Sequence, residues 1–248
     1  VLVLNASGRV IAEEFLYIGM VLAAALPLLG ILGVIGLTVA GGRPKLSAPL
    51  LLALVSLLML LGGVTLAALG SLIDATLADE TFKLRDTTWR DGTSALIALG
   101  GGLGGLSAGA LWWAPKFYGR KLNAGLAYLQ VLAFVGGVTL IAVPSLIGGG
   151  IWDLRFGPIS EGRGASEAMA ALAAVGSLVV MASLALLLLN LLLSVLGKAG
   201  EEAGDDPVGG HTLEWATASP PEAGNFAEDP EITSERPLLD AREAEEAR

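Results

Sequence analysis

The chain has 248 residues, of which 54% are hydrophobic and only 16% are charged. A soluble domain carries about 25% charged residues, so this composition excludes a soluble enzyme, a disordered protein and a nucleic-acid-binding protein, and it indicates a membrane protein. The sequence contains no Cys, which excludes a disulfide framework and a thiolate metal site. Its single His, His211, argues against a metal or haem centre built from His within this chain alone.

The net charge of −9 is distributed unevenly along the chain. Residues 199–248 contain fourteen Asp or Glu and three Lys or Arg, whereas residues 1–198 contain ten acidic and twelve basic residues. We therefore divide the sequence into an external N-terminal segment, 1–14, a near-neutral membrane domain, 15–198, and an acidic cytoplasmic tail, 199–248.

Five stretches without a charged residue are long enough to cross a bilayer, which requires about 20 apolar residues. Because lipid offers no hydrogen-bond partner to a backbone, each stretch is predicted to be helical. The predicted fold class is an all-α membrane protein with five transmembrane helices at Phe15–Ala40, Ala48–Ile73, Thr93–Ala114, Asn123–Gly148 and Ala168–Gly197.

The loops between these stretches predict the orientation. Six basic residues lie near the membrane on each side, but those after the first and third spans lie in shorter and denser loops. Basic loops are typical of the cytoplasmic side. We therefore expect the N-terminus outside the cell and the C-terminal tail in the cytoplasm.

Small residues form a stripe in the third span, where Gly101, Gly105 and Gly109 recur every four residues. Such a stripe lets a neighbouring helix or a flat cofactor approach closely, and helix packing is the favoured use, so we expect a buried face. The run Gly100–Gly105 also matches GxGxxG. It lies inside a span and not between a strand and a helix, so it does not indicate dinucleotide binding.

No ionisable side chain lies inside a predicted span, which argues against a proton relay or an ion site there. Interhelical hydrogen bonding is the favoured use of the strongest polar groups at depth, which are Thr65, Gln130, Thr139, Ser177 and Asn190. The aromatic residues at the end of the third span are interpreted as a membrane-interface belt and not as a binding cage; they are Trp112, Trp113 and Tyr118.

Two segments carry a family signature: LWWAPKFYGRKLN at 111–123 and GGHTLEWATASPPEAGNF at 209–226. Both resemble the C-terminal half of subunit I of the haem-copper cytochrome c oxidases, whose bacterial tails read DPWGGxTLEWATSSPPPxxNF. The resemblance runs from about Phe15 to Leu239 and covers family helices eight to twelve. It implies a partial subunit I bundle in a prokaryotic plasma membrane, a cytoplasmic tail, and partners among other oxidase subunits, with a separate N-terminal half of subunit I as one candidate.

The alignment also shows where this chain departs from the family at haem-binding positions. When Asp86-Thr87 is aligned with the Asp-Thr pair of the family motif, two residues fall at the positions where the family has one His ligand for each haem iron. They are Thr93 and Ala95. Neither residue is a normal haem ligand. We therefore expect no haem and no copper in this chain, and both cofactors are implied only for the family.

Other family positions are replaced as well. Ile31 stands at the Lys of the family's proton path, Leu28 at its Thr partner, and Arg85 at a His near a magnesium site. Asp86 is retained and is a weak metal candidate, but one carboxylate beside Arg85 is better suited to an ion pair than to a divalent site. Together the replacements indicate relaxed catalytic constraint on a retained fold.

The acidic tail is predicted to be disordered unless something pins it, because it has few apolar residues to bury. Leu213, Trp215 and Phe226 are its apolar anchors, and Pro220-Pro221 fixes an extended stretch between them. We expect Gly209–Phe226 to lie as an irregular strap against the basic helix ends or a partner subunit. Residues after about Leu239 are expected to stay mobile and to be dispensable.

Three hypotheses for the function follow. The favoured one is a non-catalytic, degenerate pseudo-subunit of a respiratory terminal oxidase, a complex that passes electrons from cytochrome c to O2 and pumps protons. The second is the C-terminal half of a split catalytic subunit I that another chain completes. The third is a membrane scaffold no longer linked to respiration. A haem spectrum separates the second from the others, and co-purification with oxidase subunits separates the first from the third.

Overall fold

The computed structural model describes residues 11–42, 44–76, 83–152, 163–198, 200–226, 230, 232 and 234–246. In this part of the chain the structure is helical and contains no strand, apart from a single antiparallel bridge between Arg120 and Glu202. The elements are α1 (Ile11–Gly41), α2 (Ala48–Thr76), η1 (Leu84–Asp86), α3 (Trp89–Ser94), η2 (Ala95–Leu103), α4 (Gly104–Tyr118), α5 (Ala124–Ile147), η3 (Gly148–Trp152), α7 (Arg163–Val195), η5 (Leu213–Trp215) and α8 (Pro237–Glu246).

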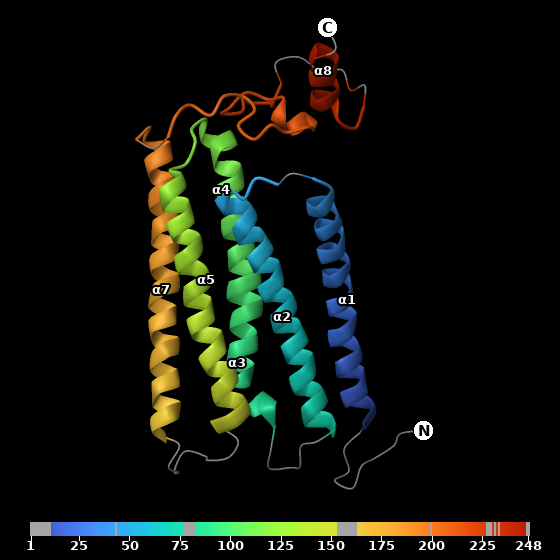
Figure 1. Ribbon diagram of the computed structural model, residues 1–248, viewed down its shortest axis with the longest axis vertical. Coiled ribbons are helices and arrows are strands. Elements are labelled where there is room, and N and C mark those ends of the chain that lie inside the picture. The colour runs from blue at the N-terminus through green and yellow to red at the C-terminus, as the bar shows by residue number, and fades with distance from the viewer. Residues whose placement is uncertain are drawn as a thin grey trace.

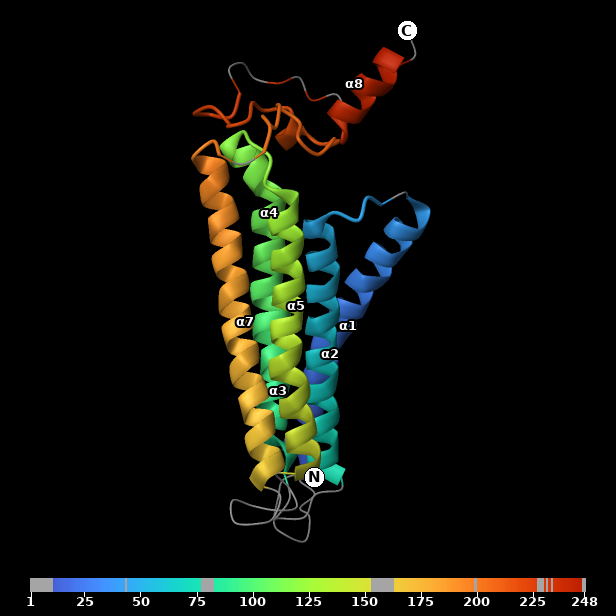
Figure 2. The same ribbon diagram turned by 60° about the vertical axis from the view of Figure 1, so that its left-hand side comes forward.

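The long helices lie side by side in a bundle, with α7 at one edge and α1 at the other (Figure 1). After α7 the chain crosses one end of the bundle, where it reaches the end of α4 and the start of α5, and α8 follows there (Figure 2). We call this the tail end of the bundle. Helix α1 packs on α2 and diverges from it toward the tail end.

Four helical stretches are long and apolar enough to cross a membrane: Ala48–Asp74, Trp89–Tyr118, Ala124–Ile151 and Glu167–Val195. A fifth helix, α1, has 31 residues, and its part from Leu26 to Gly41 is a shorter apolar helix. The all-α membrane fold predicted from the sequence is confirmed. Several helices extend past the apolar stretches that predicted them, since a helix can continue into the polar interface beyond the hydrocarbon. The third span, for example, continues to Tyr118.

The core of the bundle lies between α2, α4, α5 and α7, around Leu52, Leu111, Phe134 and Val138. Helices α5 and α7 approach most closely at Gly137 and Gly176. A Cβ at Gly137 would lie 2.8 Å from the Val180 nitrogen, and one at Gly176 would lie 2.7 Å from the Gly137 carbonyl oxygen. These glycines therefore let two backbones touch.

The third span is one continuous rod made of α3, η2 and α4, and η2 is a π-helix of nine residues. A Cβ at Gly100 would meet Met59 of α2 at 2.7 Å, and one at Gly101 would meet Leu60 at 2.7 Å. Gly104 is buried against Ser56 and Phe134. The face of this span that packs on α2 therefore includes Gly100, Gly101 and Gly104.

The three glycines of the predicted stripe differ in their surroundings within the described chain. Gly101 packs on α2, but Gly105 is exposed, and no atom lies within 4 Å of a Cβ built at Gly105 or Gly109. The reason is η2, because a π-helix bonds residue i to i+5 and holds more residues in each turn than an α-helix. A spacing of four that continues from η2 into α4 therefore does not keep one face.

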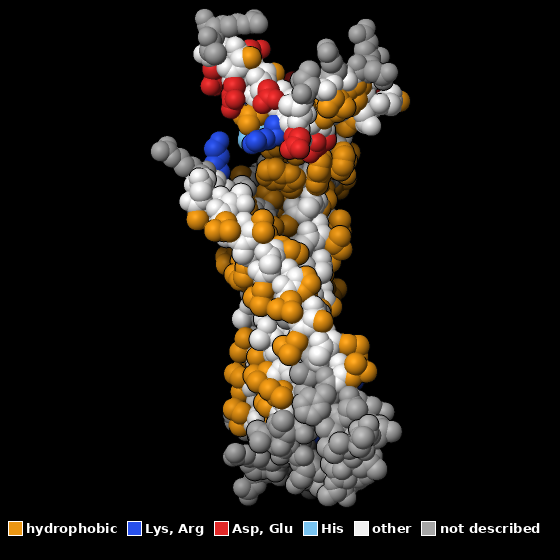
Figure 3. Space-filling model, turned by 90° about the vertical axis from the view of Figure 1, so that its right-hand side faces the viewer, with side chains coloured by type: hydrophobic (Ala, Val, Ile, Leu, Met, Phe, Trp, Pro, Cys, Tyr) orange, Lys and Arg blue, Asp and Glu red, His pale blue; other side chains and the backbone are white. Residues whose placement is uncertain are grey.

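The surface of the bundle is apolar along its length. Figure 3 shows hydrophobic side chains over the length of one face, while the Lys, Arg, Asp and Glu side chains visible there gather at the tail end. Exposed large residues include Leu29 and Val34 of α1, Leu106 of α4, and Leu178 of α7. This distribution matches a bundle with its sides in lipid and its end in water.

Candidate functional site at the tail end of the bundle

The best-defined polar site in the described chain lies where the tail meets the last turn of α4 and the loop that follows it. Helix α4 ends at Gly119, whose φ of 68° is left-handed and whose N–H donates to the Pro115 carbonyl oxygen at 3.0 Å. Glycine is the usual residue at such a helix end. A Cβ there would lie 2.9 Å from Pro220 Cδ and 2.9 Å from the Ser219 carbonyl oxygen. The tail therefore runs directly over this turn.

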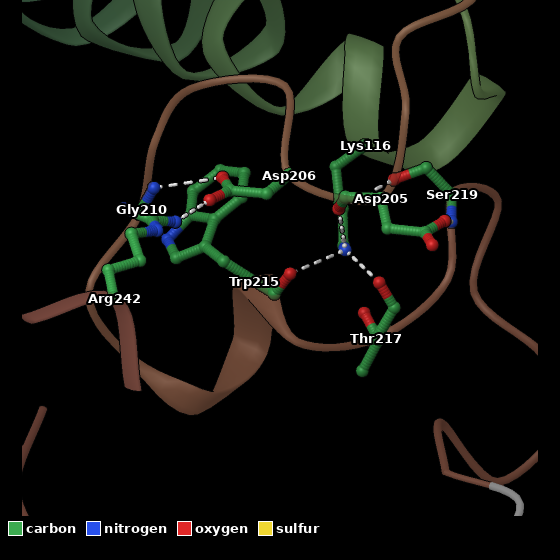
Figure 4. Close-up of polar contacts among 8 residues, drawn as sticks. All are labelled: Lys116, Asp205, Asp206, Gly210, Trp215, Thr217, Ser219 and Arg242. Atoms are coloured by element: carbon green, nitrogen blue, oxygen red, sulfur yellow. Dashed lines mark hydrogen bonds and ion pairs between the residues drawn. The ribbon is translucent and has the colours of Figure 1, made fainter. Parts of the chain in front are cut away.

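Lys116 is the centre of the site. Its side chain is only 1% exposed, and its Nζ donates to three backbone carbonyl oxygens of the tail (Figure 4). The distances are 2.7 Å to Asp205, 3.4 Å to Trp215 and 2.5 Å to Thr217. An ammonium group has three donors and no acceptor, so each donor has an oxygen. Hydrogen bonds from a charged donor are the stronger kind.

An aromatic contact lies beside Lys116. Trp215 is 6% exposed and stacks on Trp113 of α4, with ring centroids 5.0 Å apart and planes at 10°. Trp112 meets the same ring edge-on at 6.0 Å. These two residues, interpreted from the sequence as part of a membrane-interface belt, therefore also hold the tail. Aromatic pairs in such geometries stabilise by about 0.5–1.5 kcal/mol beyond their buried area.

A second attachment joins the residues after α7 to the loop 119–121. The Arg120 guanidinium donates to the carbonyl oxygens of Gly197 at 3.2 Å and Gly200 at 3.3 Å. Backbone bonds run from Lys121 N to the Glu201 oxygen at 3.0 Å and from Ala203 N to the Gly119 oxygen at 2.9 Å. The tail is therefore already held on the bundle before it reaches Lys116.

Among the polar residues at depth, Asn190 makes the predicted kind of bond between elements. Its side chain accepts from Asn123 N at 2.9 Å and donates to the Asn123 oxygen at 3.0 Å, at the start of α5. Thr139 and Ser177 instead donate to carbonyl oxygens of their own helices. Gln130 is fully buried, and its two amide atoms have no hydrogen-bond partner among the described residues.

The three predicted tail anchors differ in how deeply the structure buries them. Trp215 is buried in the site, whereas Leu213 and Phe226 are only half-buried. Sequence reasoning missed Lys116, which it counted with the basic loop residues. The sequence does show a Lys one turn after the Trp pair of α4 and the acidic pair Asp205-Asp206 in the tail, but these features indicate opposite charges and not the backbone oxygens that Lys116 binds.

Residues 240–246, which we expect to be mobile and dispensable, belong to a helix in the structure. Helix α8 begins at Pro237, the usual first-turn residue. Leu238 N donates to the His211 oxygen at 3.3 Å, and Arg242 forms an ion pair with Asp206. The helix has no buried residue. It is therefore held by these polar contacts, whereas the expectation considered only the burial of apolar side chains.

The family's haem-ligand positions lie in the third span. Thr93 is 5% exposed, and its hydroxyl donates to the Arg90 oxygen of its own helix at 3.0 Å. Ala95 is 7% exposed and begins η2. A hydroxyl held by its own helix and a methyl group offer no ligand to an iron, so these two side chains do not fit haem ligation.

Asp86 ends η1 and is exposed. The ion pair expected with Arg85 lies outside the described residues, because the Arg85 side chain is not among them. Within the described ranges no three His, Cys, Asp or Glu side chains gather as a metal site.

The comparison with known proteins gives one consistent result. No family model matches the chain. The chain is similar to cytochrome c oxidase subunit 1 of Bacillus subtilis, with 31% identity over 212 residues that cover 84% of this chain and 32% of that protein. It is 30% identical to the subunit of Thermostichus vulcanus over 207 residues, which cover 79% of this chain and 34% of the relative. The subunit of a Synechocystis strain is 29% identical over 204 residues.

These relatives confirm the resemblance predicted from the two motif segments. The chain spans about a third of the length of the curated relatives that it matches. The relation to oxidase subunit I and the integral membrane character are therefore established.

Proposed function

We propose that this relative of cytochrome c oxidase subunit 1 is a non-catalytic, structural component of an aerobic respiratory terminal oxidase. It supplies a helix bundle and a docked tail to the complex, and it ligates neither haem nor copper. The observation that carries this proposal is the contrast between the two ends of the third span. At one end, Thr93 and Ala95 have no ligand atoms for iron, whereas at the other end the motif-bearing residues around Lys116 and Trp215 form a complete site.

The proposed partners are other oxidase subunits, including an N-terminal half of subunit I where one is made as a separate chain. Helix α1 packs on α2, and large apolar side chains of its described part, among them Leu29 and Val34, are exposed, so this surface can receive further helices. We place the bundle, 15–198, in a prokaryotic plasma membrane with segment 1–14 outside. The tail, 199–248, then lies in the cytoplasm, in keeping with the basic residues at the tail end.

The test is purification of the tagged chain from its own membranes in a mild detergent. We expect oxidase subunits to co-purify, and we expect the chain separated from them to show no Soret band. Near-equimolar haem on the isolated chain would overturn the proposal. Haem together with a companion chain that carries the missing His residues would indicate a split catalytic subunit. Recovery without any oxidase subunit would indicate a scaffold outside respiration.

A matched variant tests whether the tail contributes to assembly. Trp215→Ala removes the ring that stacks on Trp113, and we expect it to lower the yield of co-purified subunits. Tyr128→Phe removes only the hydroxyl that donates to the Leu46 oxygen on the exposed surface, and we expect an unchanged yield. Equal yields from both variants would show that partners do not recognise the docked tail.

A further inference from the structure

The tail segment 205–219, which we call the tail loop, is closed by hydrogen bonds among its own residues. Ser219 N donates to the Asp205 carboxylate at 3.2 Å, and the Ser219 hydroxyl donates to the Asp205 carbonyl oxygen at 3.2 Å. Between these ends, Trp215 N bonds to the Thr212 oxygen and the Thr217 hydroxyl bonds to the Glu214 oxygen. None of these bonds involves Lys116, so the loop has its own framework.

Within this framework three carbonyl oxygens point to one position. They belong to Asp205, Trp215 and Thr217, and the Lys116 ammonium fills that position (Figure 4). Three carbonyl oxygens match a primary ammonium, because that group has three N–H donors. Three oxygens are too few for Ca²⁺, which takes about six to eight. The set is therefore better suited to an ammonium ion than to Ca²⁺.

Burial takes the Lys116 ammonium out of water, which is unfavourable for a charged group. The carboxylates of Asp205 and Asp206 act against that cost as neighbouring negative charges. Each is fixed within the tail, since Asp205 accepts from Ser219 N while Asp206 accepts from Gly210 N at 2.8 Å and pairs with Arg242. A buried cation without such partners is strongly unfavourable. The loop therefore supplies oriented oxygens and net negative charge around a single point.

We propose that the tail loop is a preformed receptor for a primary ammonium group, that Lys116 is the ligand it holds in the native chain, and that this one ligand decides whether the loop stays on the tail end of the bundle. The inference does not depend on membership of an oxidase. Its failure would leave the proposed function standing, because haem content and co-purification do not measure occupancy of the receptor.

A chemical substitution at position 116 tests the proposal in the full-length chain. The sequence has no Cys, so Lys116→Cys introduces the only thiol. Its thiolate displaces bromide from 2-bromoethylamine and forms a thioether of the same length as Lys that ends in a primary ammonium. With (2-bromoethyl)trimethylammonium the product has the same charge and nearly the same length but no N–H donor.

The readout is the rate at which chymotrypsin cleaves after Trp215. We expect the unmodified Lys116→Cys variant to be cleaved at least about tenfold faster than the native chain, because it loses hydrogen bonds to a charged group. Aminoethylation should restore protection, and the trimethylammonium product should not. Equal protection by the two products would show that charge alone suffices, and protection by neither would overturn the receptor.

Two further variants keep the result interpretable. Lys121→Cys removes a Lys of the same loop region whose ion pair with Glu201 is largely exposed, and its cleavage should match that of the native chain. Lys116→Met keeps the apolar stem and helical content while it removes the ammonium, so it should release the tail loop even if the Cys variant inserts poorly. A tail loop that remains protected in Lys116→Met would overturn the proposal.

Discussion

Gly119 shows how a single backbone conformation serves two elements. Its left-handed φ of 68° ends α4, and the missing Cβ leaves room for Ser219 and Pro220. We expect Gly119→Ala to destabilise the chain by about 1–2 kcal/mol through backbone strain alone, and to free the tail as well. Gly109→Ala is the control, since nothing lies within 4 Å of its Cβ. Thermal unfolding in detergent measures both, and equal melting temperatures would contradict the assignment.

Two adjacent glycines of α4 allow a second comparison. Gly104 is packed against Ser56 and Phe134, whereas Gly105 faces open space. We expect Gly104→Leu to reduce the yield of folded chain, because overpacking a core costs about 1–3 kcal/mol or more. Gly105→Leu should be tolerated when the chain is expressed alone. If Gly105→Leu is tolerated alone but disrupts assembly, its face is a contact for a partner helix and not for lipid.

The residues also show what sequence reasoning can and cannot reach at this scale. Thr93 and Ala95 could be singled out because a family motif gives their register. The role of Lys116 could not, because its three acceptors are backbone oxygens far along the chain, and a backbone carbonyl has no sequence signature. A basic residue just past an apolar stretch predicts a cytoplasmic loop, and nothing in that pattern distinguishes a buried ammonium from a solvated one.

At the scale of elements, the π-helix η2 explains why the three glycines of the predicted stripe do not share one face within this chain. The sequence of the third span predicts an α-helix, and i, i+4 glycines then share a face. The nine residues of η2 break that relation. Within η2, Gly100 packs closely on Met59 of α2, and Gly101 packs on Leu60. These are tertiary contacts, and they occur where the helix has π-type hydrogen bonds. Local periodicity therefore predicts that the span exists but not which of its glycines are buried.

Helix α8 contributes less to tail docking than its position implies. The Arg242–Asp206 pair is partly exposed, with 38% and 22% of the two side chains accessible, and such a pair contributes about 0–1 kcal/mol. Deleting residues 240–248 should therefore raise chymotrypsin cleavage after Trp215 only slightly and leave the melting temperature of the bundle unchanged. A loss as large as that of Lys116→Met would show that α8 is essential to the site.

At the scale of the whole molecule, the five apolar stretches predicted the helices of the bundle, because the bilayer constrains length and backbone bonding so strongly. The path of the tail was less predictable. An acidic sequence with few apolar residues resembles a disordered one, and its order here depends on Lys116, Arg120 and Trp113, which are distant in sequence from the residues they hold.

Orientation is a property of the whole bundle and can be measured directly. Reporter fusions after Gly42 and after Asp79 should report cytoplasm and exterior respectively, since the basic residues at the tail end lie in the shorter and denser loops. A fusion at the C-terminus should agree with the one at Gly42. The opposite pattern would reverse the proposed orientation and separate this chain from the topology of its relatives.

The distance along the chain between Lys116 and its acceptors has a consequence for biosynthesis. The Trp215 oxygen lies 99 residues after Lys116, and two membrane crossings, Ala124–Ile151 and Glu167–Val195, lie between them. The two groups share a side of the membrane when both crossings are complete, whereas a single missed crossing leaves the tail loop on the far side. Docking of the tail therefore depends on correct insertion of both later spans. We expect a chain with one missed crossing to leave Trp215 exposed, whereas the correctly inserted chain buries it against Trp113.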